Sequence, residues 1–229
     1  MKRRSKRYKL IEKKKLKEKT SIDKIFDIIK ETCTSKMNES IDIAVRINTK
    51  QSKGGDFNLR TVVKFPNGNG KKIRVAVLCE QEKVDEAKKS GADVAGSDDL
   101  LTNISNGKLN FDKLICTPGM MNKVGKFGKV LGPKGLMPNP KLGTVSNDIK
   151  KSISDLKTGL SEVKNDKDGN IGISIGRKNF TTKQILENLK YVFENLKKDK
   201  APIFNAENIK NVYLSSTMGL SYKISFKEF

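Results

Sequence analysis

The chain has 229 residues, enough for one large domain or two modest ones, and a formal net charge of +21 from 47 Lys and Arg against 26 Asp and Glu. Such a surplus favours a polyanionic partner, because binding releases counterions and the field steers association. No run approaches the roughly 20 apolar residues that a membrane-spanning helix needs, so a spanning protein is excluded. Nucleic acid is the first candidate partner.

The first twenty residues carry eleven Lys and Arg, and no apolar segment follows them. They predict a basic arm or a frayed helix, and we expect neither a secretory signal nor a transit peptide. The three cysteines, Cys33, Cys79 and Cys116, are widely spaced, and the chain contains no histidine. We therefore expect no disulfide framework and no metal site, as is typical of proteins in a reducing cytosol.

The first part of the chain predicts a helix and two strands. Isoleucine and phenylalanine recur at helical spacing after a cap at Thr20 or Ser21, and apolar and polar side chains alternate in the first strand, as in a half-buried sheet. In chain order the expected elements are a helix to about residue 32, a strand over 40–48, a loop over 50–57, a strand over 59–65 and a Pro- and Gly-rich turn over 66–70.

The middle of the chain alternates strand and helix at the spacing of parallel α/β domains. Residues 73–79 form a nearly continuous apolar strand, as expected when helices cover both faces of a sheet. The other expected elements are a helix over 82–90, a strand over 92–95, a helix over 97–106, a strand over 113–117 and a helix over 120–130. We predict a small parallel α/β domain over residues 68–160.

Residues 126–148 are crowded with proline, glycine and lysine, so neither a helix nor a strand can continue through them. The stretch also carries leucine, methionine and valine, which need burial, so we predict an ordered basic junction and no flexible linker. Because it lies near the end of the middle domain, we expect it to set how the two domains face each other.

The last part predicts a short helix, a hairpin, a long amphipathic helix and a final strand. In chain order these cover residues 148–156, the strands 160–164 and 171–175 about the turn 165–170, the helix 181–196 and the strand 209–215. Neither flank has enough elements to close a core by itself. We therefore predict one α+β domain built from residues 1–67 and 161–229 and interrupted by the insert.

Two motifs in the chain are distinctive: Leu-Gly-Pro-Lys-Gly-Leu-Met-Pro-Asn-Pro-Lys-Leu-Gly-Thr at 131–144 and Ser-Ser-Thr-Met-Gly at 215–219. They resemble the signatures of bacterial large ribosomal subunit protein one, the family of the ribosome's mobile exit-site stalk. Supporting matches at 6–8, 36–44, 60–71 and 91–94 spread the resemblance over nearly the whole chain. The sequence is similar to this family in several motifs that stand in the family's order.

The resemblance implies a discontinuous α+β domain of split β-α-β type and an inserted three-layer α/β domain that is Rossmann-like. It also implies a cytoplasmic, ribosome-bound protein, a monomer when free, that binds the stalk helices of large-subunit ribosomal RNA. The family further contacts exit-site tRNA, assists release of deacylated tRNA and represses translation of its own messenger RNA.

Carried over by position, the RNA-contacting residues are Lys36, Met37, Ser40, Asp166, Lys167, Thr217, Met218 and Gly219. Lysines meet phosphate, whereas hydroxyls and the backbone of the 217–219 turn can bond 2′-hydroxyls along a shallow minor groove. The chain departs from the family at Met37, where phenylalanine is usual, at Thr61, where glycine is common, and at Leu220, where proline is usual. We expect weaker discrimination at Met37 and a looser turn after Gly219.

Other interpretations remain open. Residues 217–219 form an ordinary strand-end turn if the resemblance is set aside, and Lys36 alone is a solvated lysine. The rival function is an α/β nucleotide-binding enzyme with an RNA-recruiting domain, but no G-x-G-x-x-G follows the strand 73–79 and no P-loop occurs at 132–135. A basic scaffold that binds any duplex RNA equally is the third. We favour an RNA-binding protein without enzymatic activity or cofactor.

Overall fold

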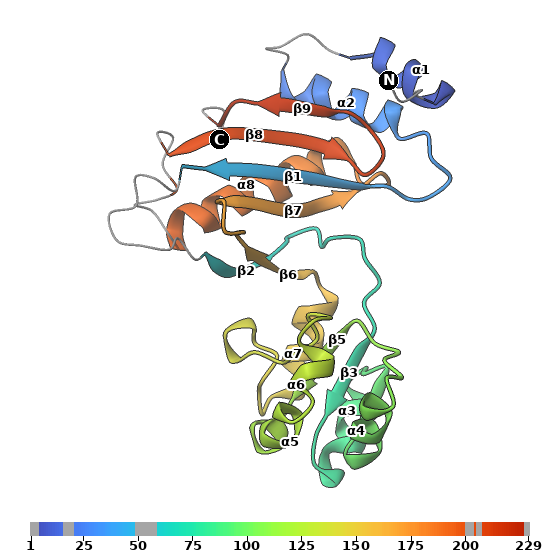
Figure 1. Cartoon of the computed structure of the whole chain (residues 1–229), viewed down its shortest axis with the longest axis vertical. Coiled ribbons are helices and arrows are strands. Elements are labelled where there is room, and N and C mark those ends of the chain that lie inside the picture. Colours follow the sequence, from blue (N-terminus) through green and yellow to red (C-terminus); the bar gives the residue numbers. More distant parts are fainter. Residues whose placement is uncertain (1–4, 16–20, 49–58, 200–203, 205–207, 227–229) are drawn as a thin grey trace. The chain divides into compact units, whose positions relative to one another are not determined.

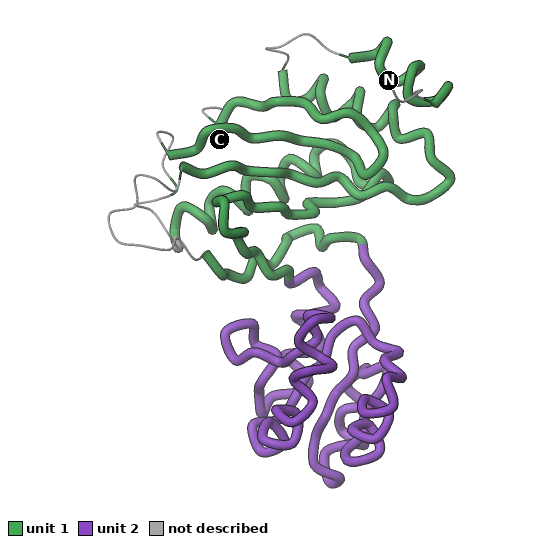
Figure 2. Tube along the Cα trace, in the orientation of Figure 1, with its two compact units in different colours: residues 1–70, 161–229 green, residues 71–160 purple. Residues whose placement is uncertain are grey.

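The computed structural model describes residues 5–15, 21–48, 59–199, 204 and 208–226. The chain packs as two compact units, Met1–Gly70 with Ser161–Phe229 (unit 1) and Lys71–Leu160 (unit 2), as Figure 2 shows. The sequence placed the first boundary between residues 67 and 68, three residues earlier than the packing does. Unit 1 thus draws on both ends of the chain, and unit 2 is continuous.

Unit 1 is built on a four-stranded sheet with the order β7-β1-β8-β9 (Figure 1). All three neighbouring strand pairs in it are antiparallel. The strands are β1 (Ser40–Ile47), β7 (Asn170–Arg177), β8 (Ile209–Ser216) and β9 (Ser221–Ile224). The central position of β1 joins the N-terminal segment to strands from the C-terminal one.

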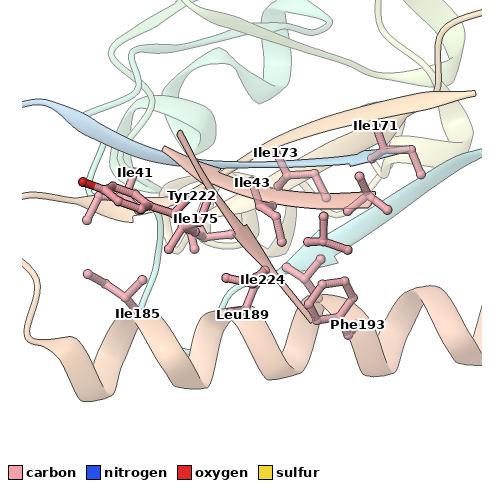
Figure 3. Close-up of a cluster of buried hydrophobic side chains, with 14 of the residues drawn as sticks. Ile41, Ile43, Ile171, Ile173, Ile175, Ile185, Leu189, Phe193, Tyr222 and Ile224 are labelled. Atoms are coloured by element: carbon pink, nitrogen blue, oxygen red, sulfur yellow. The ribbon is translucent and has the colours of Figure 1, made fainter. Parts of the chain in front are cut away.

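Helices α2 (Ile22–Thr32) and α8 (Thr182–Asp199) share one core with this sheet. Alternate residues of β1 are buried, as the apolar and polar alternation predicted. Figure 3 shows isoleucines of β1 and β7 pointing toward the apolar stripe of α8, which includes Ile185, Leu189 and Phe193. The N-terminal part supplies β1 and α2 and the C-terminal part supplies the other three strands and α8, and their buried side chains form one cluster, so the core closes only when the two parts come together.

The long helix α8 begins with a capping box. Gln184 N–H donates to the Thr181 hydroxyl at 3.3 Å, and the Gln184 side-chain oxygen accepts from Thr181 N–H at 2.9 Å. The basic arm contains a further helix, α1 (Lys6–Lys13), whose Ser5 hydroxyl accepts from Tyr8 N–H. The arm is thus helical over these residues, which agrees with the helix that was one of the two predicted alternatives.

The predicted hairpin over 160–175 is wrong. The strand β6 (Leu160–Lys164) pairs with β2 (Arg60–Lys64) in a separate two-stranded sheet, whereas β7 pairs with β1. The turn does reverse the chain, since Asn165 and Ile171 form an isolated antiparallel bridge, but the strands then separate. The alternating isoleucines of β7 gain burial by facing α8 beside those of β1, and this favours the long-range pairing.

Unit 2 is a three-layer α/β domain around a parallel sheet with the order β4-β3-β5. Every residue of β3 (Val75–Leu78) is buried, and β4 (Val94–Gly96) and β5 (Lys113–Cys116) flank it. One core of unit 2 contains side chains of α4 (Asp98–Ser105), α5 (Met121–Gly125) and α6 (Gly128–Leu131). A second core contains side chains of α3 (Val84–Lys89) and α7 (Ile149–Lys157). Short 3₁₀ turns cover Gln81–Lys83, Pro118–Met120 and Pro140–Leu142.

Two further expectations differ from the structure. The helix predicted over 120–130 is divided, since α5 ends at Gly125 and α6 begins at Gly128. Glycine is costly inside a helix, and Phe127 between the two packs against the core of unit 2. The strand β9 was not predicted; its four residues are too few for their alternation to be distinctive, and they are recruited by pairing with β8.

The proline- and glycine-rich stretch 126–148 lies wholly in unit 2. Val145 forms a parallel bridge with Cys116 at the end of β5, and Cys116 N–H donates to Thr144 O at 2.9 Å. Asn139 and Thr144 tie the intervening turn, since Asn139 N–H donates to the Thr144 hydroxyl at 2.7 Å. The stretch is therefore ordered, as predicted, and an isolated bridge joins its end to β5. Its influence on how two domains face each other stays a prediction.

Within the described ranges, none of the helices combines the length and the hydropathy required to cross a membrane.

Candidate nucleic-acid interface

The pairing of β1 with β8 brings together two segments that lie far apart in the sequence. Ile41 is opposite Ser216, so the start of β1 lies beside the turn that follows β8. Ser40 N–H donates to the Thr217 hydroxyl at 3.0 Å, and Thr217 N–H donates to Ser40 O at 3.1 Å. Residues 36–40 and 217–219, predicted separately as RNA contacts, therefore form one surface.

Two large apolar side chains are exposed on these joined segments. Met37 is 54 % exposed and Met218 is 52 % exposed, whereas most large apolar side chains of unit 1 are buried. Lys36 beside Met37 is also exposed. Exposed methionines next to a lysine suit a partner that offers both apolar surfaces and negative charge, as the sugars, bases and phosphates of RNA do.

The backbone of the 216–219 turn is already hydrogen-bonded inside the protein. Thr217 N–H donates to Ser40 O, Met218 N–H to the Glu39 carboxylate at 3.1 Å, and Gly219 N–H to Ser216 O at 3.2 Å. These three N–H donors are therefore committed, so a bond from a 2′-hydroxyl to this backbone would have to go to a carbonyl oxygen; the predicted contact stays a prediction. The Thr217 hydroxyl accepts from Ser40 N–H and donates to Ser40 O at 3.3 Å, so one acceptor position remains on it.

Gly219 lies in close approach to the side chain of Ser216. A Cβ at this position would collide with the Ser216 hydroxyl oxygen. The next residue, Leu220, is buried in the core of unit 1. This anchor argues against the expectation that leucine in place of proline loosens the turn.

The remaining predicted contacts, Asp166 and Lys167, lie at the other end of the sheet. The register sets Ser40 opposite Arg177 but Arg46 opposite Asn170, so the 165–170 turn adjoins the far end of β1. Six residues of strand separate the two ends, or about 20 Å. The predicted residues therefore form two groups on one sheet.

Asp166 already has a structural task. Its carboxylate accepts from Asp168 N–H at 3.0 Å, from Asn170 N–H at 2.7 Å and from the Asn170 side-chain amide at 2.9 Å. The Asn170 amide is the main cause that holds the pKa of this carboxyl below its usual value. Asp166 thus orders the turn, while the adjacent Lys167 is exposed.

Between the two groups lies the open face of the sheet, which the sequence reasoning did not use. Cross-strand pairing sets Gly172, Ala44, Tyr213 and Lys223 in one row across all four strands, and all four are exposed. Arg46 is exposed nearer the 165–170 turn. The alternation of β1 already predicted an outward face, so the sequence alone could place Arg46 on the open face of the sheet. Tyr213 and Lys223 could be placed on this face only once the strand pairing was known.

The cavity in unit 2 is poorly suited to bind a nucleotide. A cavity of about 380 Å³ lies beside the carboxyl end of β4, in the position where α/β folds often bind ligands. Its lining includes Asp85, Asp98 and Asp99 against the single cation Lys88, which disfavours phosphate. Within the part of the chain that the structure describes, no three His, Cys, Asp or Glu side chains are grouped to hold a metal ion.

Comparison with known proteins decides the family. The model of the ribosomal protein L1p/L10e family matches residues 29–220. The chain belongs to this family. It is 52 % identical over 218 residues to large ribosomal subunit protein uL1 of Pelagibacter ubique, which covers 92 % of this chain and 95 % of that protein.

More distant family members align over similar lengths. The chain is 38 % identical over 231 residues to large ribosomal subunit protein uL1 of Kosmotoga olearia, covering 100 % of this chain and 99 % of that protein. It is 40 % identical over 210 residues to large ribosomal subunit protein uL1c of Phaeodactylum tricornutum, covering 92 % and 91 %. The alignments thus include both units.

The resemblance drawn from the motifs is therefore confirmed. The chain is a ribosomal protein, a structural constituent of the large subunit in the cytoplasm, and not an enzyme. The rival interpretation as a nucleotide-binding enzyme is set aside on this ground. The individual residues that touch RNA remain predictions.

Proposed function

We propose that unit 1 binds the stalk helices of large-subunit ribosomal RNA through one surface on its four-stranded sheet. The surface runs from the joined segments 36–40 and 217–219, across the open face, to the turn at 165–170. The observation that carries the proposal is the exposure of Met37 and Met218 on segments that hydrogen bonds hold together. Solvent exposure of two such side chains is unfavourable unless a partner covers them.

Each end of this surface has its own chemistry. At the methionine end, Met37 and Met218 pack on sugar or base while Lys36 meets phosphate. At the turn end, Lys167 meets phosphate, and Asp166 contributes by ordering the turn that carries it. Recognition of this kind reads mainly the shape of a folded RNA, because most of these groups meet its backbone.

The finer roles follow from the same surface. We propose that the protein, a monomer when free, represses its own messenger by binding an RNA structure that resembles the stalk, so that ribosomal and messenger RNA compete for unit 1. We further propose that unit 2 acts as a mobile arm that assists release of deacylated tRNA from the exit site. The net positive charge of the chain favours all three RNA partners.

The test of the surface is Met218→Ala. We expect it to weaken binding to a stalk RNA fragment by about 1–3 kcal/mol, since it removes one specific contact and leaves the charge unchanged. Gel-shift titration at about 150 mM salt against this fragment and a scrambled duplex measures the effect. Repression of a reporter that carries the chain's own messenger leader should fall in parallel.

Tyr191→Ala is the matched control. Tyr191 is another exposed large side chain, but it lies on α8, which covers the opposite face of the sheet. This variant should bind both RNAs as the wild type does. Unchanged binding of the Met218 variant to stalk RNA would show that the surface is misplaced.

A further inference from the structure

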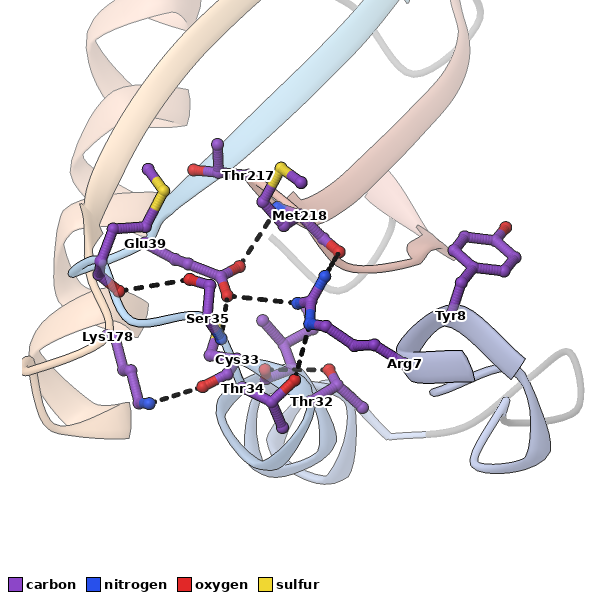
Figure 4. A network of polar contacts seen from close by, with 12 residues as sticks. Arg7, Tyr8, Thr32, Cys33, Thr34, Ser35, Glu39, Lys178, Thr217 and Met218 are labelled. Atoms are coloured by element: carbon purple, nitrogen blue, oxygen red, sulfur yellow. Dashed lines mark hydrogen bonds and ion pairs between the residues drawn. The ribbon is translucent and has the colours of Figure 1, made fainter. Parts of the chain in front are cut away.

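The basic arm reaches the proposed surface through Arg7. The Arg7 guanidinium contacts three acceptors on two other segments, with Nε donating to the Thr34 hydroxyl at 2.8 Å, Nη1 to Met218 O at 3.2 Å and Nη2 to the Glu39 carboxylate at 3.5 Å (Figure 4). The Arg7 side chain is 32 % exposed and the Glu39 side chain is fully buried. The contacts of Arg7 therefore face inward, toward the turn that carries Met218.

Glu39 is the centre of this network. Besides Arg7, its carboxylate accepts from Ser35 N–H at 3.2 Å and from Met218 N–H at 3.1 Å. Burial raises the pKa of Glu39, but hydrogen bonds from Ser35 and Met218 outweigh this effect and leave the pKa below its usual value. A buried carboxylate that stays charged needs such donors around it, so the network is closed only when the arm is docked.

The network fixes the backbone of Met218. Glu39 holds the N–H of this residue and Arg7 holds its carbonyl oxygen, so both sides of its backbone are fixed while its side chain remains half exposed. Thr217, one residue earlier, is fixed by Ser40. A contact surface held in this way loses less conformational freedom when it binds, which favours the shape-matched partner.

We propose that Arg7 and Glu39 are positioning residues for RNA recognition, and that α1 is a built part of the recognition surface. This inference rests on the proposed function, because it assigns a cause to the presentation of Met218. The alternative is that Arg7, like the other cations of the arm, adds only positive charge. The two accounts differ in what happens when the charge is kept and the geometry is changed.

Arg7→Lys makes that distinction. Lysine keeps the charge, but its single ammonium cannot replace a planar guanidinium that meets three acceptors. We expect binding to the stalk RNA fragment to weaken roughly tenfold, with binding to a scrambled duplex and the salt dependence unchanged. Lys9→Arg is the control, because it makes a charge-conserving exchange at an exposed position of the same helix, and it should bind as the wild type does.

A second, milder variant tests the same role in case Arg7→Lys destabilises the fold. Thr34→Val removes one acceptor of Arg7 and leaves both charges of the Arg7–Glu39 pair, so it should weaken stalk RNA binding in the same direction but less. All titrations are made well below the melting temperature of each variant, as followed by circular dichroism.

The outcomes separate this inference from the proposed function. If Arg7→Lys and Thr34→Val both bind stalk RNA as the wild type does, while Met218→Ala weakens it, the positioning role is wrong and the surface stands. If Arg7→Lys weakens binding to both RNAs equally, Arg7 does not act through recognition of the stalk RNA and the inference is also overturned. If Met218→Ala has no effect, the surface itself is wrong.

Discussion

Glu39 shows how one residue links the stability of unit 1 to its proposed surface. The carboxylate is fully buried, yet its pKa lies below the usual value because hydrogen bonds from Ser35 and Met218 outweigh the effect of burial. A group whose pKa is lower in the folded state stabilises that state above its unfolded pKa and loses this contribution as the pH falls through its folded pKa. The contribution of Glu39 is therefore present at neutral pH and lost in acid.

The direction of this pKa shift predicts how the stability of Glu39→Gln depends on pH. At pH 7 the variant should lose about 1–3 kcal/mol of unfolding free energy, because an amide cannot accept at both oxygens and its NH₂ group faces N–H donors. Urea denaturation measures the loss. The difference from the wild type should begin to shrink below the ordinary glutamate pKa of 4.5, where Glu39 of the unfolded chain takes up a proton, and should vanish once folded Glu39 is protonated as well.

Other carboxylates also titrate in this range, among them Asp93 and Asp166, whose pKa values are lowered too. The difference between the two proteins, and not the absolute stability, is thus the quantity to compare. A difference that stays constant down to acid pH would contradict the assignment of a charged Glu39.

At the scale of the element, α8 does more than cover the sheet. Asn188 on this helix is fully buried, and its side-chain amide donates to Gly68 O at 3.0 Å and to Ile175 O at 2.8 Å. Its side-chain oxygen accepts from Asn67 N–H at 3.2 Å. One side chain thus satisfies three backbone groups of β7 and of the turn that leads out of unit 1.

Replacing this side chain should therefore be costly. We predict that Asn188→Leu, which has nearly the same shape, lowers the unfolding free energy by about 2–4 kcal/mol, because three backbone groups lose their partner in a buried site. Asn195→Ala on the same helix is the control, since that amide donates only to a carbonyl of its own helix, Tyr191 O. Similar urea midpoints for the two variants would contradict the role given to Asn188.

At the scale of the whole molecule, the two units have separate cores. The apolar cluster of unit 1 contains no residue of 71–160, and both clusters of unit 2 contain only residues of that range. The two points where the chain leaves and re-enters unit 1 lie close together, because the Asn69 side-chain amide is 3.4 Å from the Ser161 hydroxyl. The insert can therefore be removed without stretching the chain across unit 1.

We predict that a protein in which residues 71–160 are replaced by a short Gly-Ser linker folds cooperatively and binds the stalk RNA fragment within about threefold of the full chain. Ribosomes that carry it should release deacylated tRNA more slowly, which filter binding measures. The isolated insert, residues 71–160, is the control and should not bind the fragment. Loss of stalk RNA binding by the deletion protein would show that the insert takes part in recognition.

Local patterns in the sequence determined most of the elements. The alternation over 40–48 defines which face of β1 is buried, the continuous apolar run at 73–79 defines a strand covered on both sides, and the motifs at 131–144 and 215–219 identify the family. Periodicity succeeds in these cases because the burial of a side chain depends on its position within its own element.

Only the tertiary structure decided what each element packs against. It separated β6 from β7 and recruited β9. It also joined Arg7 to Glu39 and to Met218, which lies 211 residues further along the chain. Strand pairing and buried polar networks depend on groups that are distant in sequence, so no local pattern specifies them. The exposed methionines were visible as residues, but their place on one surface follows from the pairing of β1 with β8.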